Sequence, residues 1–366
     1  MILMNDFKAE SDELKESMHL ASRKVLDSGW YVLGKEVENF EREWSQACGV
    51  AYGVGVGNGM DAIEIALRSL DIGSGDEVIT TSMTAFATVL AISRAGATPI
   101  LADIEIDTAQ LSIESAKRCI TKKTKAIVLV HLYGEVRNAQ AWVDLCNENN
   151  IELIEDCAQA HLATWQGRVA GSFGKAGAYS FYPTKNLGAP GDAGMLVTND
   201  ESVAVKASCL RNYGQSVRYH HPVLGMNSRL DEMQAAILSA RLKWLAEFTE
   251  RRREIASFYR TEIKNPLISL LSEPQESSSH AYHLFVVICN TRDKLQAHLQ
   301  LCGIQALIHY PIPIHHQKPC ENILRDPQGL RNSEDHANTC LSLPCHPQMT
   351  DDDLTHVIDA VNSFLC

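Results

Sequence analysis

Lys185 stands in a segment that could support amine chemistry. It follows a short apolar run and lies among aromatic, proline and glycine residues, in the sequence SFYPTKNLG that begins at Ser180. A lysine in a partly dry pocket has a lowered amine pKa, which is what Schiff-base chemistry needs. The segment by itself leaves two interpretations open, a reactive amine and a surface charge beside a turn.

Asp156 is the second candidate, because it ends an apolar run in the sequence IEDCAQAH. Open α/β sheets bind ligands at the carboxyl ends of their strands. A buried carboxylate also needs a partner. A protonated ring nitrogen of a cofactor, an internal arginine or backbone donors would each provide one, and this segment does not choose among them.

A glycine-rich segment, residues 53–62, runs from a predicted strand into a predicted helix. Glycines let a ligand approach the backbone closely, and the free N–H groups of a helix start bind phosphate. A loose dinucleotide fingerprint is the alternative, but it requires an acid at the end of the second strand. Asp76 and Glu77 precede that strand instead. The pattern therefore favours phosphate binding over dinucleotide binding, with a purely structural turn as the third interpretation.

The elements that must position these residues alternate between strands and helices in the first two-thirds of the chain. The predicted strands are Tyr52–Val56, Glu77–Thr80, Thr98–Ala102, Ala126–Val130, Glu152–Glu155, Ala178–Phe181 and Met195–Thr198. The predicted helices are Asp61–Leu70, Ala85–Ala95, Ile113–Ile120 and Ala139–Asn149. The strands are nearly continuous in apolar residues, which predicts an α/β fold with a mainly parallel, seven-stranded sheet covered by helices.

The last third of the chain predicts a smaller α+β unit. One long amphipathic helix is expected from about residue 230 to 259, capped by Asn227 or Ser228 and favoured by acidic residues in its first turn. A strand at 282–288, a helix at 292–302 and a helix from 351 follow. We therefore predict a large domain over residues 1–245 and a small C-terminal domain over 246–366.

Composition excludes several classes of function. Lys and Arg total 33 against 45 Asp and Glu, a formal net charge of −12, which disfavours a nucleic-acid surface. No apolar run is long enough to span a membrane, and the first residues lack the apolar core of a signal peptide. We therefore expect a cytoplasmic protein.

Metal binding is not expected either. The 11 cysteines form no C-x-x-C pair, so they indicate neither a zinc site nor a disulfide framework. His309, His315 and His316 fit no helix face, and a loop that lines a pocket is the preferred interpretation.

The combination of motifs is more informative than any one of them. A phosphate-binding helix start, a strand-end Asp156 and then Lys185 are the parts needed to hold pyridoxal phosphate. The chain resembles the DegT/DnrJ/EryC1/StrS family of sugar aminotransferases, a branch of the fold-type I pyridoxal-phosphate enzymes. The resemblance extends over nearly the whole length and is carried by GNGMDAIEIALRSLDIGSGDEVIT, TKAIVLVHLYG, IEDCAQAH, SFYPTKNLGAPGDAG and NSRLDEMQAA.

The resemblance implies roles for the cofactor residues. Lys185 would form the internal aldimine, Asp156 would pair with the pyridine nitrogen and Gln159 would approach the phenolic oxygen. His161 would lie beside the cofactor as a further catalytic residue. The phosphate would be bound by Ser180 and by the helix start at Gly59, Met60 and Asp61.

The resemblance also implies a homodimer with shared active sites, in which Asn227 reaches the phosphate of the neighbouring subunit's cofactor. The substrate-binding residues would be Tyr182, Arg229, His309 and Tyr310. Many relatives carry a ring-stacking aromatic residue where this chain has Ala85, so the stacking partner stays open.

The implied reaction moves an amino group from L-glutamate to a keto-sugar nucleotide. Some relatives have His in place of the lysine and dehydrate their substrate, so Lys185 favours transamination. GNGMDA, HLYG and residues 308–313 are most similar to the branch that converts dTDP-3-keto-6-deoxyhexose to dTDP-3-amino-3,6-dideoxyhexose. O-antigen (lipopolysaccharide), S-layer and antibiotic sugars are all open as its use, and a surface polysaccharide is the expectation. A 4-aminotransferase acting on a dTDP- or UDP-4-keto-6-deoxyhexose and a pyridoxal-phosphate-binding protein without turnover are the alternatives.

Overall fold

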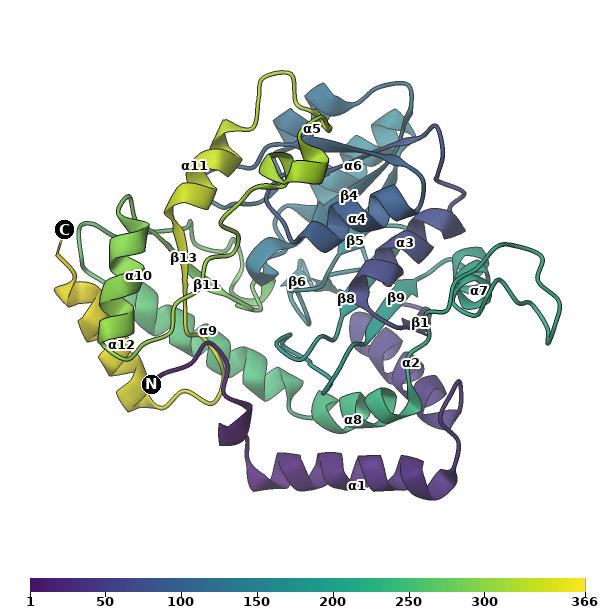
Figure 1. The fold of residues 1–366 in the computed structure, drawn as a ribbon, viewed down its shortest axis with the longest axis horizontal. Coiled ribbons are helices and arrows are strands. Elements are labelled where there is room, and N and C mark those ends of the chain that lie inside the picture. The colour runs from purple at the N-terminus through teal and green to yellow at the C-terminus, as the bar shows by residue number, and fades with distance from the viewer. Residues whose placement is uncertain (366) are drawn as a thin grey trace.

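The computed structural model describes residues 1–365 and has an eight-stranded central sheet (Figure 1). Its strands are β1 (Tyr52–Val56), β2 (Glu77–Thr81), β3 (Thr98–Ala102), β4 (Thr124–Val130), β5 (Glu152–Asp156), β8 (Ala176–Ser180), β9 (Gly194–Thr198) and β12 (Leu324–Arg325). The order is β1-β9-β8-β5-β4-β2-β3-β12, and only β9 runs against its neighbours. The mainly parallel sheet is confirmed, with β12 as an additional strand.

Helices cover both faces of this sheet, as the continuous apolar strands require. One face packs against α3 (Gly59–Ser69), α4 (Phe86–Arg94) and α7 (Glu201–Leu210). The other face packs against α2 (Lys35–Cys48), α5 (Ile113–Cys119), α6 (Ala139–Asn149) and α8 (Glu232–Leu242). Residues alternate between the two cores along each strand: Ala126 and Val128 face α3, whereas Ile127 and Leu129 face α6.

A smaller α+β unit lies beside the sheet (Figure 1). Its three-stranded antiparallel sheet has the order β10-β11-β13 and comprises β10 (Ser269–Leu270), β11 (Phe285–Ile288) and β13 (Cys340–Leu343). It shares one apolar core with α9 (Leu245–Glu262), α10 (Arg292–Leu301) and α12 (Asp351–Ser363). The domain division at residue 245 stays a prediction. Contacts that cross it include the pairing of β12 with β3 and that of Ile2 with Ile304.

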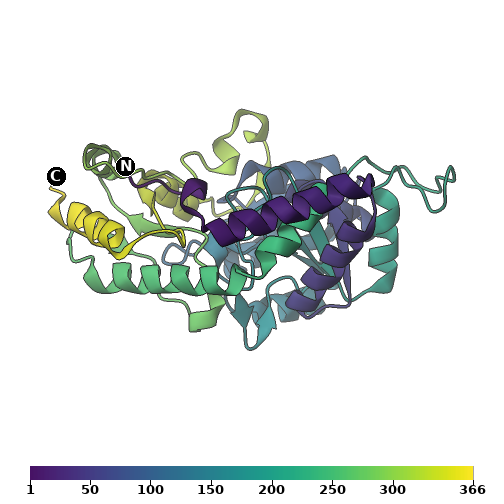
Figure 2. The ribbon, with the colours of Figure 1, turned by 90° about the horizontal axis from the view of Figure 1, so that it is seen from below.

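The remaining elements connect these layers. They are α1 (Asp12–Ser28), the hairpin of β6 (Thr164–Trp165) and β7 (Arg168–Val169), α11 (Arg331–Thr339), and the 3₁₀ turns η1 (Phe7–Ala9), η2 (Leu132–Gly134), η3 (Ser277–Ser279), η4 (Ile314–His316) and η5 (Lys318–Cys320). Helix α1 lies along α8 (Figure 2). Glu10, just before α1, forms a buried ion pair with Arg241 of α8. Within residues 1–365, every helix is too short or too polar to cross a bilayer.

The prediction of one long helix is wrong, because a turn divides it into α8 and α9. Trp244 N–H bonds to the carbonyl of Arg241, an i to i+3 bond that tightens the chain for one turn. Trp244 keeps right-handed helical dihedral angles. The apolar stripe therefore continues through the turn, and the sequence pattern does not reveal where the helix is divided.

The predicted cap of this helix is also wrong. The residue before α8 is Asp231, and its side chain makes no capping bond. Glu232 was expected to interact with its own helix dipole, but its carboxylate accepts the N–H groups of Gly34, Glu36 and Val37 and so caps α2. A partner almost two hundred positions away leaves no local pattern in the sequence.

Candidate active site

The carboxyl ends of β4, β5 and β8 meet at one edge of the sheet because these strands are parallel neighbours. Asp156 is the last residue of β5, and Lys185 lies in the connection that follows β8. The start of α3 at Gly59 comes to the same edge, where it contacts Ser180 at the end of β8. The fold therefore brings together the three motifs that the sequence separates.

Asp156 is a buried carboxylate with few partners. Thr88 Oγ1 on α4 donates a hydrogen bond to its Oδ2 at 2.8 Å, and the Ala158 N–H donates to its Oδ1 at 3.1 Å. Burial raises the pKa of Asp156, and these two bonds together with the charges of Lys185 and His131 partly offset the rise. A carboxylate can accept about four hydrogen bonds. Asp156 can therefore accept a further donor, as pairing with a protonated ring nitrogen requires.

The amine of Lys185 and this carboxylate influence each other's pKa through their charges. Burial lowers its pKa from 10.5 to about 8, and the charge of Asp156 partly offsets that change. Its charge in turn helps to lower the pKa of His161 and of His309, which places all three groups around one site. An amine with a pKa near 8 is unprotonated in a sizeable fraction of molecules at neutral pH, as nucleophilic attack requires.

The start of α3 has the form of an anion site. A Cβ atom on Gly59 would lie 2.6 Å from the Cβ of Ser180, so only glycine permits this approach of helix to strand. Within residues 1–365, the N–H groups of Gly59 and Met60 have no hydrogen-bond acceptor. The Asp61 N–H differs from expectation, because Asn58 Oδ1 accepts it at 2.9 Å as the helix cap.

The Asp61 side chain anchors α3. Its carboxylate accepts hydrogen bonds from Ser228 Oγ at 2.7 Å and from Asn58 Nδ2 at 3.1 Å, and it pairs with Arg94 at 3.3 Å. Of the three residues expected to present backbone N–H groups to a phosphate, Gly59 and Met60 are available and Asp61 is occupied.

Gln159 connects two segments around the site. Its Oε1 accepts the Tyr133 N–H at 2.6 Å, and its Nε2 donates to Tyr310 Oη at 3.2 Å. Burial, with the charge of Asp156 as a second cause, raises the pKa of Tyr310 to about 12. His309 Nδ1 lies 2.8 Å from Ser342 Oγ, and burial lowers its pKa to about 4. Gln159, His309 and Tyr310 therefore come together, as the resemblance implies.

His161 lies behind the site. It is fully buried, with its ring centroid 5.5–5.6 Å from those of Trp44, Tyr179 and Phe181. Its Nε2–H donates to the carbonyl of Ser180 at 2.9 Å, and burial lowers its pKa to about 3. The neutral, enclosed imidazole supports the strand end that carries Ser180, and its catalytic role stays a prediction.

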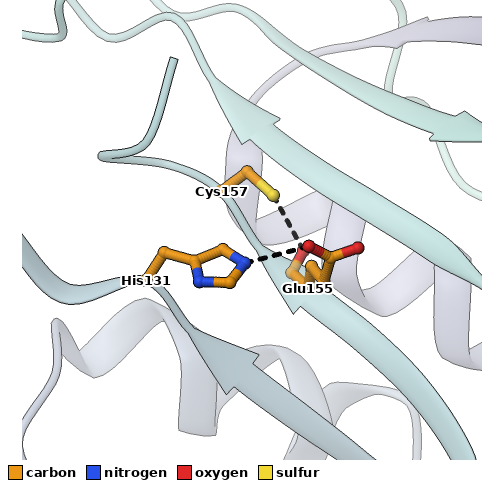
Figure 3. Close-up of side chains that lie close together, drawn as sticks. All are labelled: His131, Glu155 and Cys157. Atoms are coloured by element: carbon orange, nitrogen blue, oxygen red, sulfur yellow. Dashed lines mark hydrogen bonds and ion pairs between the residues drawn. The ribbon is translucent and has the colours of Figure 1, made fainter. Parts of the chain in front are cut away.

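Glu155 and His131 form a brace that sequence inspection did not identify (Figure 3). The Glu155 carboxylate accepts His131 Nε2–H at 2.9 Å and the N–H groups of Gly171, Phe173 and Gly174, each at 2.8 Å. The Cys157 thiol donates to the Glu155 carbonyl at 3.7 Å. These three side chains are close enough to share a metal ion, but four donors already occupy the carboxylate, which marks the cluster as structural.

Two expected substrate residues, Tyr182 and Arg229, and the expected phosphate residue Asn227 are at least partly exposed to solvent. Tyr182 is 51% exposed, and Asn227 is exposed and pairs by its backbone with Asn212. Arg229 donates to Asn212 Oδ1 at 3.1 Å, and its guanidinium lies 5.3 Å from the centre of the Tyr213 ring. Asn227 and Arg229 lie at the base of an arm, residues 213–224, which projects from the molecule beside α7 (Figure 1).

His315 and His316 lie apart from His309. Their Nε2 atoms are 3.0 and 3.7 Å from Glu334 Oε1 on α11. His315 is buried and His316 is exposed.

The sheet, the anion site at Gly59, the half-buried Lys185 amine and the buried Asp156 carboxylate are the features of an aminotransferase. The chain belongs to the DegT/DnrJ/EryC1/StrS aminotransferase family, whose model matches residues 12–362. Enzymes of this family and fold in general depend on pyridoxal phosphate. The residues present here fit that group, since they provide a half-buried amine with a lowered pKa, a carboxylate with free acceptor capacity and a cradle that only glycine allows.

Several similar proteins are named as sugar transaminases. It is 43% identical over 364 residues to a dTDP-3-amino-3,6-dideoxy-alpha-D-galactopyranose transaminase of Aneurinibacillus thermoaerophilus, covering 100% of this chain and 99% of the relative. The structure of Streptomyces venezuelae DesV in complex with a ketimine intermediate matches with a TM-score of 0.94 and 40% identity, over 99% of this chain and 97% of DesV. NtdA of Bacillus subtilis with bound cofactor PMP matches with a TM-score of 0.88 and 28% identity, over 96% and 82% of the two chains.

Proposed function

We propose that this aminotransferase moves an amino group from L-glutamate to dTDP-3-keto-6-deoxyhexose and forms dTDP-3-amino-3,6-dideoxyhexose. The observation that carries the proposal is the half-buried Lys185 amine, with a pKa of about 8, beside the incompletely hydrogen-bonded Asp156. The choice of the 3-amino product is supported by the 43% identity to the Aneurinibacillus enzyme, whose name specifies a 3-amino-3,6-dideoxy sugar linked to dTDP.

Each residue of the site has a distinct task in this proposal. Pyridoxal phosphate, when bound, supplies an electrophilic aldehyde and an electron sink. Lys185 Nζ would hold that group at rest and, once the donor amine has displaced it, would take the proton from the donor's α-carbon and later return one. Asp156 keeps a proton on the ring nitrogen. Ser180, Gly59 and Met60 hold the phosphate, and Gln159 orients the ring through its phenolic oxygen.

Two substrates use one site in turn, so we expect ping-pong kinetics. Glutamate donates its amino group and leaves as a keto acid before the keto-sugar nucleotide binds. Tyr182, Arg229, His309 and Tyr310 would contact the sugar nucleotide. We place the reaction in the cytoplasm, in the supply of a deoxyamino sugar for a surface polysaccharide such as O-antigen.

We further propose that the working enzyme is a homodimer in which Asn227 completes the neighbour's phosphate site. The exposed Asn227 at the base of the arm supports this arrangement, as do apolar residues on the arm, since Tyr219 is 77% and Leu224 88% exposed. Apolar side chains gathered on one projecting segment are typical of a surface that is covered by a partner.

A panel of keto-sugar nucleotides tests the proposal directly. The purified enzyme is incubated with glutamate and either a 3-keto or a 4-keto sugar, linked to dTDP or UDP, and the products are identified by mass spectrometry. We expect the amino product from the dTDP-linked 3-keto sugar. Conversion of 4-keto sugars alone would identify a 4-aminotransferase, and absence of any spectral change with glutamate would identify a cofactor-binding protein without turnover.

A further inference from the structure

Tyr133 follows β4 in the 3₁₀ turn η2 and has an unusual backbone conformation. Its φ angle is +61°, in the left-handed region that residues other than glycine seldom adopt, and the side chain is 1% exposed. Holding a tyrosine there costs on the order of the energy of one hydrogen bond, so surrounding contacts must fix it. Two of those contacts lead to residues of the proposed site, Gln159 and His309.

The backbone of Tyr133 fixes Gln159. Its N–H donates to Gln159 Oε1 at 2.6 Å, which turns Gln159 Nε2 toward Tyr310 Oη at 3.2 Å. The left-handed turn thus sets the orientation of the amide that is expected at the cofactor's phenolic oxygen.

The side chain of Tyr133 fixes the segment His309–Tyr310. Its hydroxyl donates to the carbonyl of His309 at 2.5 Å and lies 2.8 Å from His336 Nε2 on α11. A hydroxyl has one proton. Because the carbonyl can only accept, that proton points to His309 and His336 Nε2–H must donate to the hydroxyl oxygen. Burial lowers the pKa of His336 to about 4, so its ring is neutral and has one N–H to give.

We propose that Tyr133 and His336 are positioning residues, which hold Gln159 on the cofactor side and His309–Tyr310 on the sugar side in one fixed relation. The inference rests on the proposed function, because it assigns those two sides from it. A phenylalanine at position 133 would keep the ring and the N–H bond to Gln159 but lose both hydroxyl bonds. The change should therefore act on the sugar half-reaction and spare the glutamate half-reaction.

The experiment measures the two half-reactions separately in the full-length, pyridoxal-phosphate-loaded enzyme. Loss of the cofactor's absorbance band on mixing with glutamate reports the first, and its return on mixing with the keto-sugar nucleotide reports the second. For Tyr133→Phe we expect kcat/KM of the sugar half-reaction to fall about ten-fold, the scale of one lost buried hydrogen bond, and the glutamate half-reaction to stay within about two-fold. His336→Leu should reproduce the same split more weakly, and adding it to Tyr133→Phe should cause little further loss.

Tyr259→Phe is the matched control. Tyr259 is fully buried in the core of the small unit and donates to the carbonyl of Pro344 at 2.7 Å, so it also loses a buried hydroxyl bond. Stability should fall in this variant without a change in either half-reaction. Equal losses in both half-reactions of Tyr133→Phe, or none in either, would overturn the inference.

A crystal structure of Tyr133→Phe separates failure of the inference from failure of the proposed function. Displacement of His309–Tyr310 supports the positioning role even if the wild type reacts with neither substrate, which would refute the proposed function alone. An undisturbed His309–Tyr310 segment would contradict the positioning role. If Tyr133→Phe does not fold, the same measurements on His336→Leu decide the question.

Discussion

Glu155 and Asp156 are consecutive buried acids on opposite faces of β5, and their surroundings differ in one respect. Glu155 accepts four hydrogen bonds, three from backbone N–H groups and one from His131. Asp156 accepts one from Thr88 and one from Ala158. A fully occupied carboxylate holds a fold together, whereas a partly occupied one beside a half-buried amine is available for chemistry. Hydrogen-bond occupancy therefore separates structure from function where residue type and burial do not.

The comparison predicts that Asp156→Asn removes activity and spares the fold. An amide cannot keep a proton on a ring nitrogen, so kcat should fall about a thousand-fold, the scale of a lost preorganised charge. The free energy of unfolding should change by less than about 1 kcal/mol, because the side chain keeps its shape and loses a buried charge. Steady-state kinetics and urea unfolding on the same preparation check both halves, and a collapse of stability would contradict the assignment.

Glu155→Gln should behave in the opposite way. The amide presents an N–H₂ group to backbone donors and weakens charge-assisted bonds, which should destabilise the protein by about 2–4 kcal/mol. Activity per folded molecule should stay within a few-fold of wild type. His131→Asn, which removes one donor from the same carboxylate, should cost about half as much. A Glu155→Gln variant with a large loss of kcat and an unchanged midpoint of urea unfolding would contradict the comparison.

Gly59→Ala tests the anion site on its own. The new Cβ would lie 2.6 Å from Ser180 Cβ, so the helix start must move away from the strand end. We expect the affinity for pyridoxal phosphate to fall about ten-fold, because loss of one or two phosphate contacts is worth about that much. The unliganded protein should also lose about 1–3 kcal/mol of stability, because the close packing of the helix start on Ser180 is disturbed. Fluorescence titration of the cofactor-free protein measures the affinity. Gly75→Ala places a Cβ where it meets no neighbouring atom, at a φ of +94°, and shows the effect of a glycine substitution away from the site.

The smallest expected effect is the dependence of folding stability on pH. Burial lowers the pKa of His161 to about 3 and those of His309 and His336 to about 4, from 6.5. The unfolded chain therefore binds more protons than the folded one between pH 6.5 and 4, so these residues' contribution is complete above pH 6.5 and is lost as the pH falls. Each adds at most about 1.4 kcal/mol per pH unit.

The acids oppose this trend, because the raised pKa of Asp156 and of Glu135, the latter to about 7, favours the folded state at low pH. Urea unfolding at pH 7.5, 6 and 5 should nonetheless show declining stability. His336→Gln should reduce the decline, and His316→Gln, at an exposed residue, should not. A stability that stays level to pH 5 would contradict the assignment of these histidines as buried and neutral.

The sequence predicted what depends on local patterns. Continuous apolar strands specified the parallel sheet, and strand ends and helix starts brought Asp156, Lys185 and Gly59 to one edge. It could not predict partners that are distant in the chain. Strand β12 has two residues and pairs with β3 more than two hundred positions earlier, and Glu232 caps α2 across a similar separation.

The direction of a side chain was the second property that the sequence could not predict. His161 follows Asp156 by five positions in the same motif, but no spacing rule says which way its ring turns once the strand has ended. Similarly, Glu155 and Asp156 are two consecutive acids whose types do not reveal their roles. Only the alternation of strand faces assigns one to the brace and the other to the site.

The central claim is that Lys185 Nζ forms the covalent bond to the pyridoxal phosphate aldehyde. Borohydride reduction of the purified enzyme, followed by peptide mass spectrometry, tests it most directly. We expect a phosphopyridoxyl group on Lys185, with no adduct and no turnover in Lys185→Ala. A stable adduct on another lysine, or full activity in Lys185→Ala, would contradict the account.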